Sequence, residues 1–324
     1  EEILSILSGW GVEPAAAYTA PGLETSHRAA AEGDYYYFYN NTQSPIEATV
    51  ALNGQGAPYR LDAYTGDVIP LALYRQDSGR TLINIKLEPR ESAIFAMTEG
   101  NPSFPKVKDV HVTKTGGGDA VYVDGSIMHR SGKPGAYEVS LSDNSQKTFT
   151  VDAVPAAVAV LNGWDLSLES WGPDPEANKV DPTLSAKKTI TFKDIPLSTW
   201  SDLPATKAQI ESLGVDAMNH VSGIGTYTTA FTLPPDWNAD TGAILQLTHG
   251  ADMVIEVLVN DHKIDDVNQL TNRVDVGAYL NPGKNTLMVK LVTTLKHRKD
   301  LQSPGGSGLM GGGGSAPQGG MPDG

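Results

Sequence analysis

Short runs of aromatic, aliphatic and β-branched residues, separated by turn-forming residues, make up most of the chain after residue 33. The first of these stretches read YYYFYN, ATVAL, TLINIKL and SAIFAM, with Asn-Gly, Thr-Gly-Asp and Asp-Ser-Gly between them. Short runs of aromatic and β-branched residues bounded by such turns are typical of β-strands. The pattern therefore predicts a β-sandwich over residues 31–100.

Two further β units are expected downstream. Residues 101–158 carry the strand-like segments KVKDVHVTK, AVYVDG, AYEVSL and KTFTVDAV, which predict a second, small β unit. Residues 159–302 carry longer runs, among them LNGWDLSLESWG, KTITFKDIP, YTTAFTLP, AILQLTHG, MVIEVLVND and NTLMVKLVTTL. Long strands separated by clusters of turn residues favour antiparallel sheets packed face to face, so a jelly roll is expected here.

Helical spacing is confined to two segments. Ile3, Leu4, Ile6, Leu7 and Trp10 predict a short N-terminal helix that ends at Gly11, and ATKAQIESLGV predicts a second helix over residues 205–215. Residues 303–324 contain 10 Gly and 3 Pro, too little apolar surface to offset the entropy of ordering, so this segment is expected to be flexible. The fold class is therefore all-β.

The charge balance excludes several classes of partner. The 324 residues contain 24 Lys and Arg against 38 Asp and Glu, a net charge of −14, which disfavours both nucleic acid and anionic membrane surfaces. The longest apolar stretch is far shorter than the ~20 residues of a membrane span. The absence of cysteine excludes thiol nucleophiles and zinc sites that use sulfur.

No motif identifies a catalytic residue or a metal site. Five acids lie in or beside predicted strands, but no spacing shows which of them converge, so we expect a solvated face rather than a catalytic pair: Asp124, Glu138, Asp252, Glu256 and Asp275. The seven histidines are scattered, without paired ligand spacing. No cofactor is required by the sequence. Calcium, bound by Asp, Asn and backbone oxygens, is left open as a structural ion.

Several long strings resemble a known family. LETSHRAAAEGDYYYFYNNTQSPIEATVAL and APYRLDAYTGDVIPLALYRQDSGRTLINIKLEPRESAIFAM resemble the region that follows the catalytic part of α-L-rhamnosidases of glycoside hydrolase family 106. VSGIGTYTTAFTLP, MVIEVLVNDHKIDDV and RVDVGAYLNPGKNTLMVKLVTTLKHR resemble the galactose-binding-like jelly roll shared with family 2 β-glycosidases. The pattern positions of the first region are held by His27, Arg28, Asp34, Tyr35, Asn40, Leu61, Asp62, Thr65 and Gly66. Departures occur at Asn260-Asp261-His262 and at His297-Arg298.

The resemblance implies an organisation and a function. Residues 1–30 would be the end of an upstream α/β segment and a linker. The parent protein would be a secreted or periplasmic glycosidase, and these residues its ancillary C-terminal region, which supports a catalytic barrel elsewhere in the polypeptide and binds rhamnose-containing plant polysaccharide. No family catalytic residue is carried over, because no alternation of strands and helices here could build the barrel. The sequon Asn40-Asn41-Thr42 fits secretion only weakly.

A sugar site is expected on the jelly roll. Aromatic faces and planar polar groups commonly bind sugars, which points to the loops near Trp200, Tyr227, His249, Asp252 and Arg273. Core and rim packing is the competing interpretation of the aromatic residues. Two other functions stay open at this point: a stand-alone carbohydrate-binding or adhesive protein, and an enzyme complete within these residues.

Overall fold

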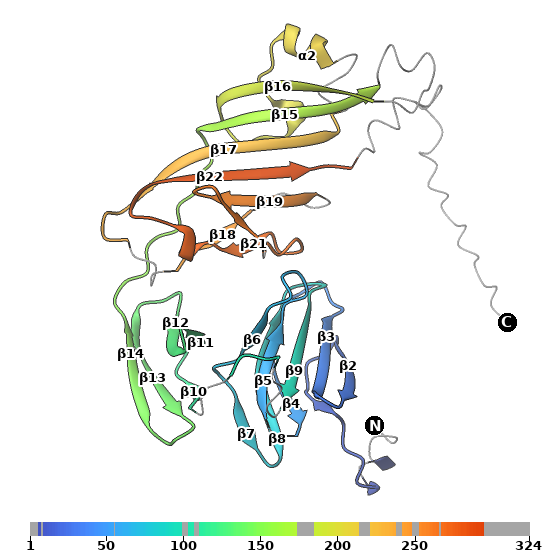
Figure 1. Ribbon diagram of the computed structural model, residues 1–324, viewed down its shortest axis with the longest axis vertical. Coiled ribbons are helices and arrows are strands. Elements are labelled where there is room, and N and C mark those ends of the chain that lie inside the picture. Colours follow the sequence, from blue (N-terminus) through green and yellow to red (C-terminus); the bar gives the residue numbers. More distant parts are fainter. Residues whose placement is uncertain are drawn as a thin grey trace, which may run out of the picture. The chain divides into compact units, whose positions relative to one another are not determined.

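The computed structural model consists of two compact units: unit 1, Glu1–Val158, and unit 2, Ala159–Gly324 (Figure 1). It describes residues 6–7, 9–54, 56–98, 103–106, 110–173, 185–213, 221–237, 242–247, 253–265 and 267–294. Both units are built from antiparallel strands, which confirms the expected all-β fold class. The subdivision of unit 1 into 31–100 and 101–158 stays a prediction.

Unit 1 contains a sandwich of two antiparallel sheets. The five-stranded sheet has the order β2 (Leu23–Ala30), β3 (Gly33–Asn40), β9 (Ser92–Thr98), β5 (Ala57–Leu61) and β6 (Val68–Pro70). The four-stranded sheet has the order β1 (Ala16–Ala17), β4 (Ile46–Asn53), β8 (Arg80–Leu87) and β7 (Arg75–Asp77).

Alternation along the strands decides which side chains enter the sandwich core. Tyr36 and Phe38 of β3 are 1% and 0% exposed, and they pack with Val50, Leu52 and Ile83 from the other sheet. The tyrosines that alternate with them in YYYFY point to the opposite face, because successive side chains of a strand lie on opposite sides of the sheet. One strand thus contributes both to the core and to an outer surface.

The rest of unit 1 is a smaller β assembly with its own hydrophobic cluster. A three-stranded sheet, β10 (Val112–Thr115), β13 (Gly135–Leu141) and β14 (Gln146–Val151), lies with the hairpin β11 (Asp119–Val123) and β12 (Ser126–Arg130) around that cluster. Backbone hydrogen bonds from Tyr74 N–H to Val112 O (3.0 Å) and from Val112 N–H to Ala72 O (2.7 Å) join it to the sandwich.

Two stretches of unit 1 differ from the sequence-based expectation. Residues 1–30 were expected to be an upstream segment and linker, but 16–17 and 23–30 are strands β1 and β2 of the sandwich. Strand β12 was not anticipated either. Asp124 and Gly125, at φ 46° and 70°, form the two-residue turn that closes the β11–β12 hairpin, and this Asp-Gly signal could have found it.

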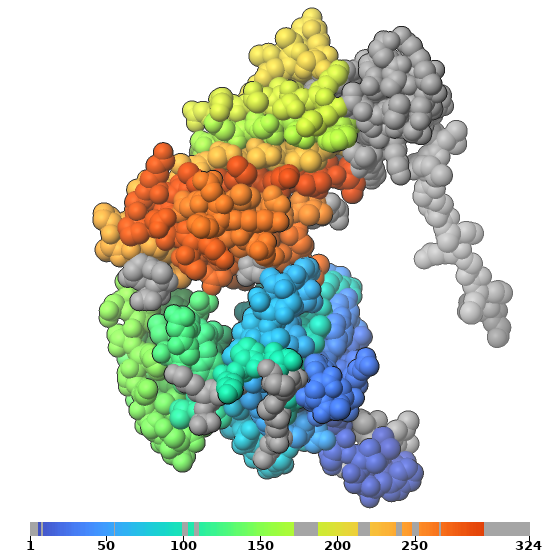
Figure 2. Space-filling view, viewed as in Figure 1, coloured from blue at the N-terminus to red at the C-terminus, as the bar shows by residue number. Residues whose placement is uncertain are grey.

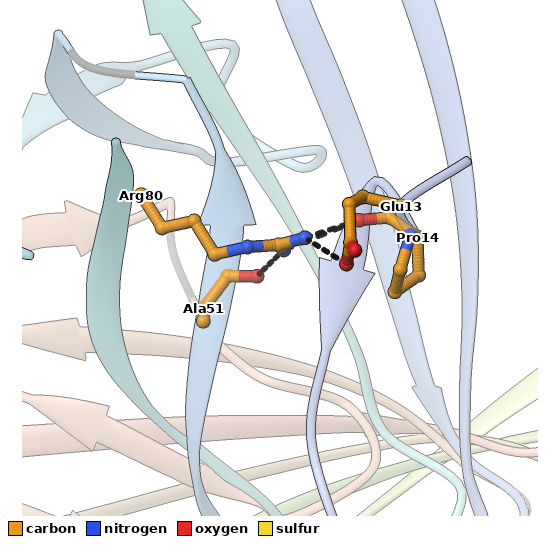
Figure 3. A network of polar contacts seen from close by, with 4 residues as sticks. All are labelled: Glu13, Pro14, Ala51 and Arg80. Atoms are coloured by element: carbon orange, nitrogen blue, oxygen red, sulfur yellow. Dashed lines mark hydrogen bonds and ion pairs between the residues drawn. The ribbon is translucent and has the colours of Figure 1, made fainter. Parts of the chain in front are cut away.

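An arginine fastens the N-terminal segment to the sandwich. Arg80 at the start of β8 donates hydrogen bonds to Pro14 O and Ala51 O at 3.1 and 3.2 Å, and its guanidinium lies 3.4 Å from the Glu13 carboxylate (Figure 3). Residues 6, 7 and 9, which lie before this contact, are helical, as expected for the N-terminal helix. The remaining residues of the predicted helix 1–5 and Ser8 lie outside the described residues.

Unit 2 is the expected jelly roll. Its six-stranded sheet has the order β16 (Ser185–Ile195), β15 (Trp164–Pro173), β17 (Gly223–Leu233), β22 (Gly283–Val292), β19 (Val254–Val259) and β20 (His262–Ile264). A two-stranded sheet pairs β18 (Ile244–Gln246) with β21 (Arg273–Asp275). Buried residues of both sheets, such as Leu168, Val257 and Val274, belong to a single hydrophobic cluster.

The helical elements of unit 2 are short. The predicted helix over 205–215 is confirmed as α2 (Lys207–Leu213), and two 3₁₀ turns, η2 (Trp200–Asp202) and η4 (Gly277–Tyr279), were not anticipated. Of the described residues 243–247 of the segment AILQLTHG, Ile244–Gln246 form β18. The Gly-rich segment 303–324 lies outside the described residues. In the described part of the chain, the helices are all too short or too polar to pass through a bilayer.

Candidate functional site

Two of the predicted sugar-binding residues meet at one end of the jelly-roll core. Trp200, in η2, donates a hydrogen bond from its indole Nε1 to the Tyr227 hydroxyl on β17, at 2.8 Å. Gly225 makes room for the indole, since a Cβ at this position would lie 2.7 Å from Cζ2 of Trp200. Trp164 packs edge-on against Tyr227, with ring centroids 6.1 Å apart. The three aromatic side chains form one cluster.

The cluster is a packing arrangement more than an open surface. Tyr227 is only 5% exposed, and burial raises the pKa of its phenol, partly opposed by the hydrogen bond from Trp200. The phenol therefore stays protonated at neutral pH, and its ring faces are covered by protein. Trp200 is half-buried and packs against the same core. Of the two residues, Trp200 is the one that keeps partly exposed surface for a sugar.

The other predicted site residues are separate from this cluster or outside the described residues. Arg273 is exposed on β21, where its register partner is Gln246 of β18. His249 and Asp252 lie outside the described residues. The structure thus brings together Trp200 and Tyr227 and leaves Arg273 on the two-stranded sheet. Sugar contact by these five residues stays a prediction.

Two of the described strand acids, Glu256 and Asp275, have local partners. Glu256 lies 3.5 Å from the Lys263 ammonium and 3.9 Å from that of Lys290, and Asp275 accepts the Gly277 N–H at the start of η4. Asp124 is a turn residue, and Glu138 is exposed on β13 opposite Thr148. These contacts are those of ordinary surface and turn acids.

A shallow depression beside the β2–β3 turn contains two further acids. It has a volume of about 270 Å³ and is lined by Glu32, Asp34, Met97 and Thr98, among others. Asp34 is held by His27, whose Nε2 lies 2.7 Å from its carboxylate, and the His27 ring stacks on Tyr36. Among the described residues, His, Asp and Glu side chains nowhere gather in threes that could hold a metal ion.

Two asparagines of the resemblance motifs are structural. Asn285 is 0% exposed; its Nδ2 donates to Asn281 O and Gly283 O at 2.8 and 2.9 Å, and its Oδ1 accepts from the Asn281 N–H and the Asn260 Nδ2, both at 2.8 Å. Asn260 in turn accepts the Thr286 N–H and donates to Tyr279 O. The two motifs thus fasten two turns to each other, because backbone groups buried there need side-chain partners.

Asn40 has the corresponding role in unit 1. It is 0% exposed, and its Nδ2 donates to three backbone carbonyls, those of Ser44, Leu87 and Glu88, at 2.8 to 3.2 Å. Its Oδ1 accepts from the Thr42 backbone and hydroxyl. The nitrogen that would carry a glycan in the sequon is fully engaged and buried, so the folded protein cannot be glycosylated there.

Sequence reasoning missed a surface of unit 1. Tyr35, Tyr37 and Tyr39 project from the outer face of β3, and we call these three residues the tyrosine row. Tyr37 is 43% exposed and the other two are half-buried. The run of five aromatic residues in YYYFYN was the signal that could have found the row, since successive side chains of a strand lie on opposite faces and such a run places aromatic rings on both.

Comparisons with known proteins agree with this architecture. Residues 220–314 match the family model described as glycosyl hydrolase 2 galactose-binding domain-like. The structure of a rhamnosidase from Novosphingobium sp. PP1Y matches with a TM-score of 0.59 and 19% sequence identity, over 91% of this chain and 22% of that chain. The chain therefore spans about a fifth of the length of that rhamnosidase.

More distant matches add nothing to the fold assignment. Two structures of the GH42 beta-galactosidase Gan42B, one of them a catalytic mutant from G. stearothermophilus, cover 30% of this chain and 12% of theirs at 18% identity, with a TM-score of 0.21. No curated protein sequence matches the chain. At the level of fold, the resemblance to the β-domains of a rhamnosidase, including a family 2-type galactose-binding-like jelly roll, is confirmed.

Proposed function

We propose that this chain is the ancillary, non-catalytic region of a glycoside hydrolase similar to α-L-rhamnosidases, and that it supports a catalytic barrel elsewhere in the polypeptide. The supporting observation is that one match, to a rhamnosidase, extends over both units and 91% of this chain while it covers 22% of that rhamnosidase. A region that is similar throughout to a minor part of a larger enzyme is best explained as the corresponding part of a similar enzyme.

The local chemistry of the described residues fits a supporting role. The strand acids form ion pairs with lysines, cap turns or lie exposed, and the motif asparagines fasten turns. Glycoside hydrolysis needs two carboxyl groups about 5 to 9.5 Å apart with the glycosidic bond between them. The nearest candidate, the depression with Glu32 and Asp34, is open, and one of its acids is engaged by His27.

Rhamnose release tests the proposal. The isolated 324-residue chain is expected to release no rhamnose from rhamnogalacturonan fragments, whereas the longer polypeptide encoded by the same gene is expected to release it. Reproducible turnover by the isolated chain would contradict the proposal. In that case Asp34→Asn is the first variant to assay, because Asp34 lines the depression.

We further propose that unit 2 contacts the rhamnose-containing polysaccharide, which such an enzyme would meet outside the cytoplasm. Arg273 is the predicted contact best suited to a test, because it is exposed while Tyr227 is buried. Calorimetry with rhamnogalacturonan fragments should show weaker binding by Arg273→Ala than by the native chain. Lys284→Ala is the matched control, since it removes an exposed cation elsewhere on unit 2. Equal heats of binding for all three proteins would show that Arg273 does not contact the polysaccharide.

A further inference from the structure

The outer face of the five-stranded sheet in unit 1 is divided into a covered half and an open half. On the covered half, Phe104 packs edge-on against Tyr59 of β5, with centroids 4.9 Å apart, and the Tyr59 hydroxyl donates to Pro105 O at 3.0 Å. Tyr59 is consequently 5% exposed. The chain itself therefore places an aromatic ring on this face, so the face accepts apolar contacts.

The open half carries the tyrosine row. In the register of the sheet, Tyr37 of β3 lies beside Ile94 of β9, and Ile94 lies beside Leu61 of β5, so the row continues the face that Phe104 covers. The segment that contains β2 and β3 lies at an outer margin of unit 1 in the space-filling view (Figure 2). Within the described residues, the hydroxyls of Tyr35 and Tyr37 have no hydrogen-bond partner.

Polar groups border the row on both sides. On β2, Arg28, Ser26 and Glu24 stand opposite the three tyrosines and are all exposed. On β9, Ser92 stands opposite Tyr39 and is exposed. The row is thus a flat, mostly apolar track along one strand, with hydrogen-bonding groups at its margins.

We propose that the tyrosine row binds a neutral oligosaccharide chain that lies along β3. Sugar rings present C–H faces that pack on aromatic rings and hydroxyls that reach polar groups at the rim, and tyrosine combines an apolar ring with a polar end. The track is about 13 Å long at roughly 3.3 Å per residue, enough for a short stretch of a linear glycan. Glu24 and Arg28, of opposite charge, border the two ends of the row, so its margin has no net positive charge that would favour a polyanion.

A folded protein is a poorer occupant for this surface. A stable protein interface buries about 800 Å² on each partner. A tyrosine ring contributes at most roughly 250 Å², and Tyr37, the most exposed member of the row, is 43% exposed. The row therefore offers far less area than a second copy of the chain or another folded domain would need, whereas a single extended glycan needs only a narrow track.

Affinity electrophoresis and titration with neutral glycans test the proposal. Native protein is expected to be retarded in gels that contain xyloglucan, galactomannan or arabinogalactan, with at least one of the three effective, and not in gels that contain polygalacturonate. Tyr37→Ala should weaken that binding about tenfold, which corresponds to about 1.4 kcal/mol. The substitution is on an exposed position, so the fold is expected to survive, and circular dichroism melts check this.

The matched control is Tyr64→Ala, which removes a 65% exposed tyrosine from a turn outside the row. Binding should be unchanged in this variant. The proposal is overturned if no neutral glycan retards the native protein, or if folded Tyr37→Ala binds as well as the native chain does. It is also overturned if sedimentation shows a dimer that Tyr37→Ala dissociates, because the row would then be an interface.

This inference goes beyond the function proposed above, and it can fail independently. The tyrosine row lies in unit 1, while the contact proposed for the enzyme's polysaccharide lies in unit 2. Loss of binding in Tyr37→Ala with normal binding in Arg273→Ala supports the row alone. The reverse result supports only the unit 2 contact. Neither outcome depends on whether the longer polypeptide releases rhamnose.

Discussion

The two units differ in how their hydrophobic cores are built. In unit 2, one hydrophobic cluster spans both sheets, and the long strands β15, β17 and β22 run through it. In unit 1, the sandwich and the smaller β assembly have separate clusters, joined around Val112 by backbone hydrogen bonds and by the stacking of His111 on Tyr74. A continuous core makes the whole of unit 2 depend on every strand, whereas unit 1 has a junction at which its parts can lose contact first.

The two units also share one structural feature. In each, one fully buried asparagine binds several backbone groups of neighbouring turns: Asn40 in unit 1 and Asn285 in unit 2. A buried amide that satisfies carbonyl and N–H groups stabilises a turn that the sheet itself cannot pair. The comparison shows that motif residues can reflect the demands of backbone hydrogen bonding without any contact with a ligand.

Removing these amides is expected to have the largest effect. Asn285→Ala and Asn40→Ala should each lower the free energy of unfolding by about 3 kcal/mol, because several buried backbone groups lose their partners. Hydrogen exchange measured by mass spectrometry should place the loss in unit 2 and unit 1, respectively. Asn162→Ala and Asn53→Ala, at exposed asparagines of the same units, should change stability by less than about 0.5 kcal/mol.

The nearly isosteric substitution Asn285→Asp tests whether Asn285 stabilises unit 2 by its side-chain volume or by the hydrogen bonds that its amide donates. It keeps the side-chain volume but replaces the donor by an oxygen that faces the carbonyls of Asn281 and Gly283. It should therefore destabilise unit 2 as much as the alanine variant does. If this variant is as stable as the native chain, the amide donor of Asn285 is dispensable. Asn285 would then not have the stabilising role that is proposed for both Asn285 and Asn40.

The next largest effect is expected when the pH is lowered, which should destabilise unit 1 more than unit 2. His111, at the junction of unit 1, is 8% exposed and stacks on Tyr74 with centroids 3.7 Å apart, and burial lowers its pKa. Burial also lowers the pKa of His129, partly opposed by Asp119. Both histidines therefore bind a proton more readily in the unfolded state than in the folded state. Unit 1 should be most stable above pH 6.5 and lose stability as the pH falls below that value.

The measurement is thermal unfolding between pH 7.5 and 5. His111→Phe keeps a ring against Tyr74 but cannot bind a proton, so it should reduce the dependence of unit 1 on pH. The described hydrophobic core of unit 2 contains no histidine. The hydrogen bond from Lys193 lowers the pKa of Asp165 in unit 2, so this carboxyl group titrates below the pH range of the measurement. A steeper pH dependence in unit 2 than in unit 1 would contradict the assignment.

The smallest effect is expected at the N-terminal attachment. Arg80→Ala removes the hydrogen bonds to Pro14 O and Ala51 O and should cost about 1 kcal/mol, with faster proteolysis near residues 9–12 (Figure 3). Arg75→Ala, which removes an exposed ion pair with Asp77, is the control and should have little effect. Equal proteolysis of both variants would show that Arg80 does not hold the segment.

The strands of both units could be predicted where the periodicity was strong. YYYFYN, TLINIKL and NTLMVKLV correspond to β3, β8 and β22. Strand β2, with LETSHRAA, was missed because it is an exposed edge strand, seven of whose eight residues are exposed, so the apolar alternation that marks a half-buried strand is absent. In the described part of AILQLTHG, the strand β18 is limited to the three residues that pair with β21.

The candidate site was predicted less well than the fold. Tyr227 and Trp200 were chosen for their chemistry, but β17 turns Tyr227 into the core, where it is hydrogen-bonded to Trp200. Composition cannot distinguish an aromatic residue of the core from one at a ligand surface, since both need the same apolar ring. The difference depends on which face of the strand the residue occupies and on what packs against that face.

The amino-acid sequence by itself determined the all-β class, the short turns and the inward alternation of strands such as β8 and β22, because these follow from the local period of apolar residues and from the preferences of Gly, Asn and Asp in turns. Only the tertiary structure decided that Asn40 and Asn285 bind turn backbones, that Phe104 covers Tyr59, and that Tyr37 stays exposed. These contacts join residues far apart in the chain, and strand order and register, which no local pattern encodes, bring them together.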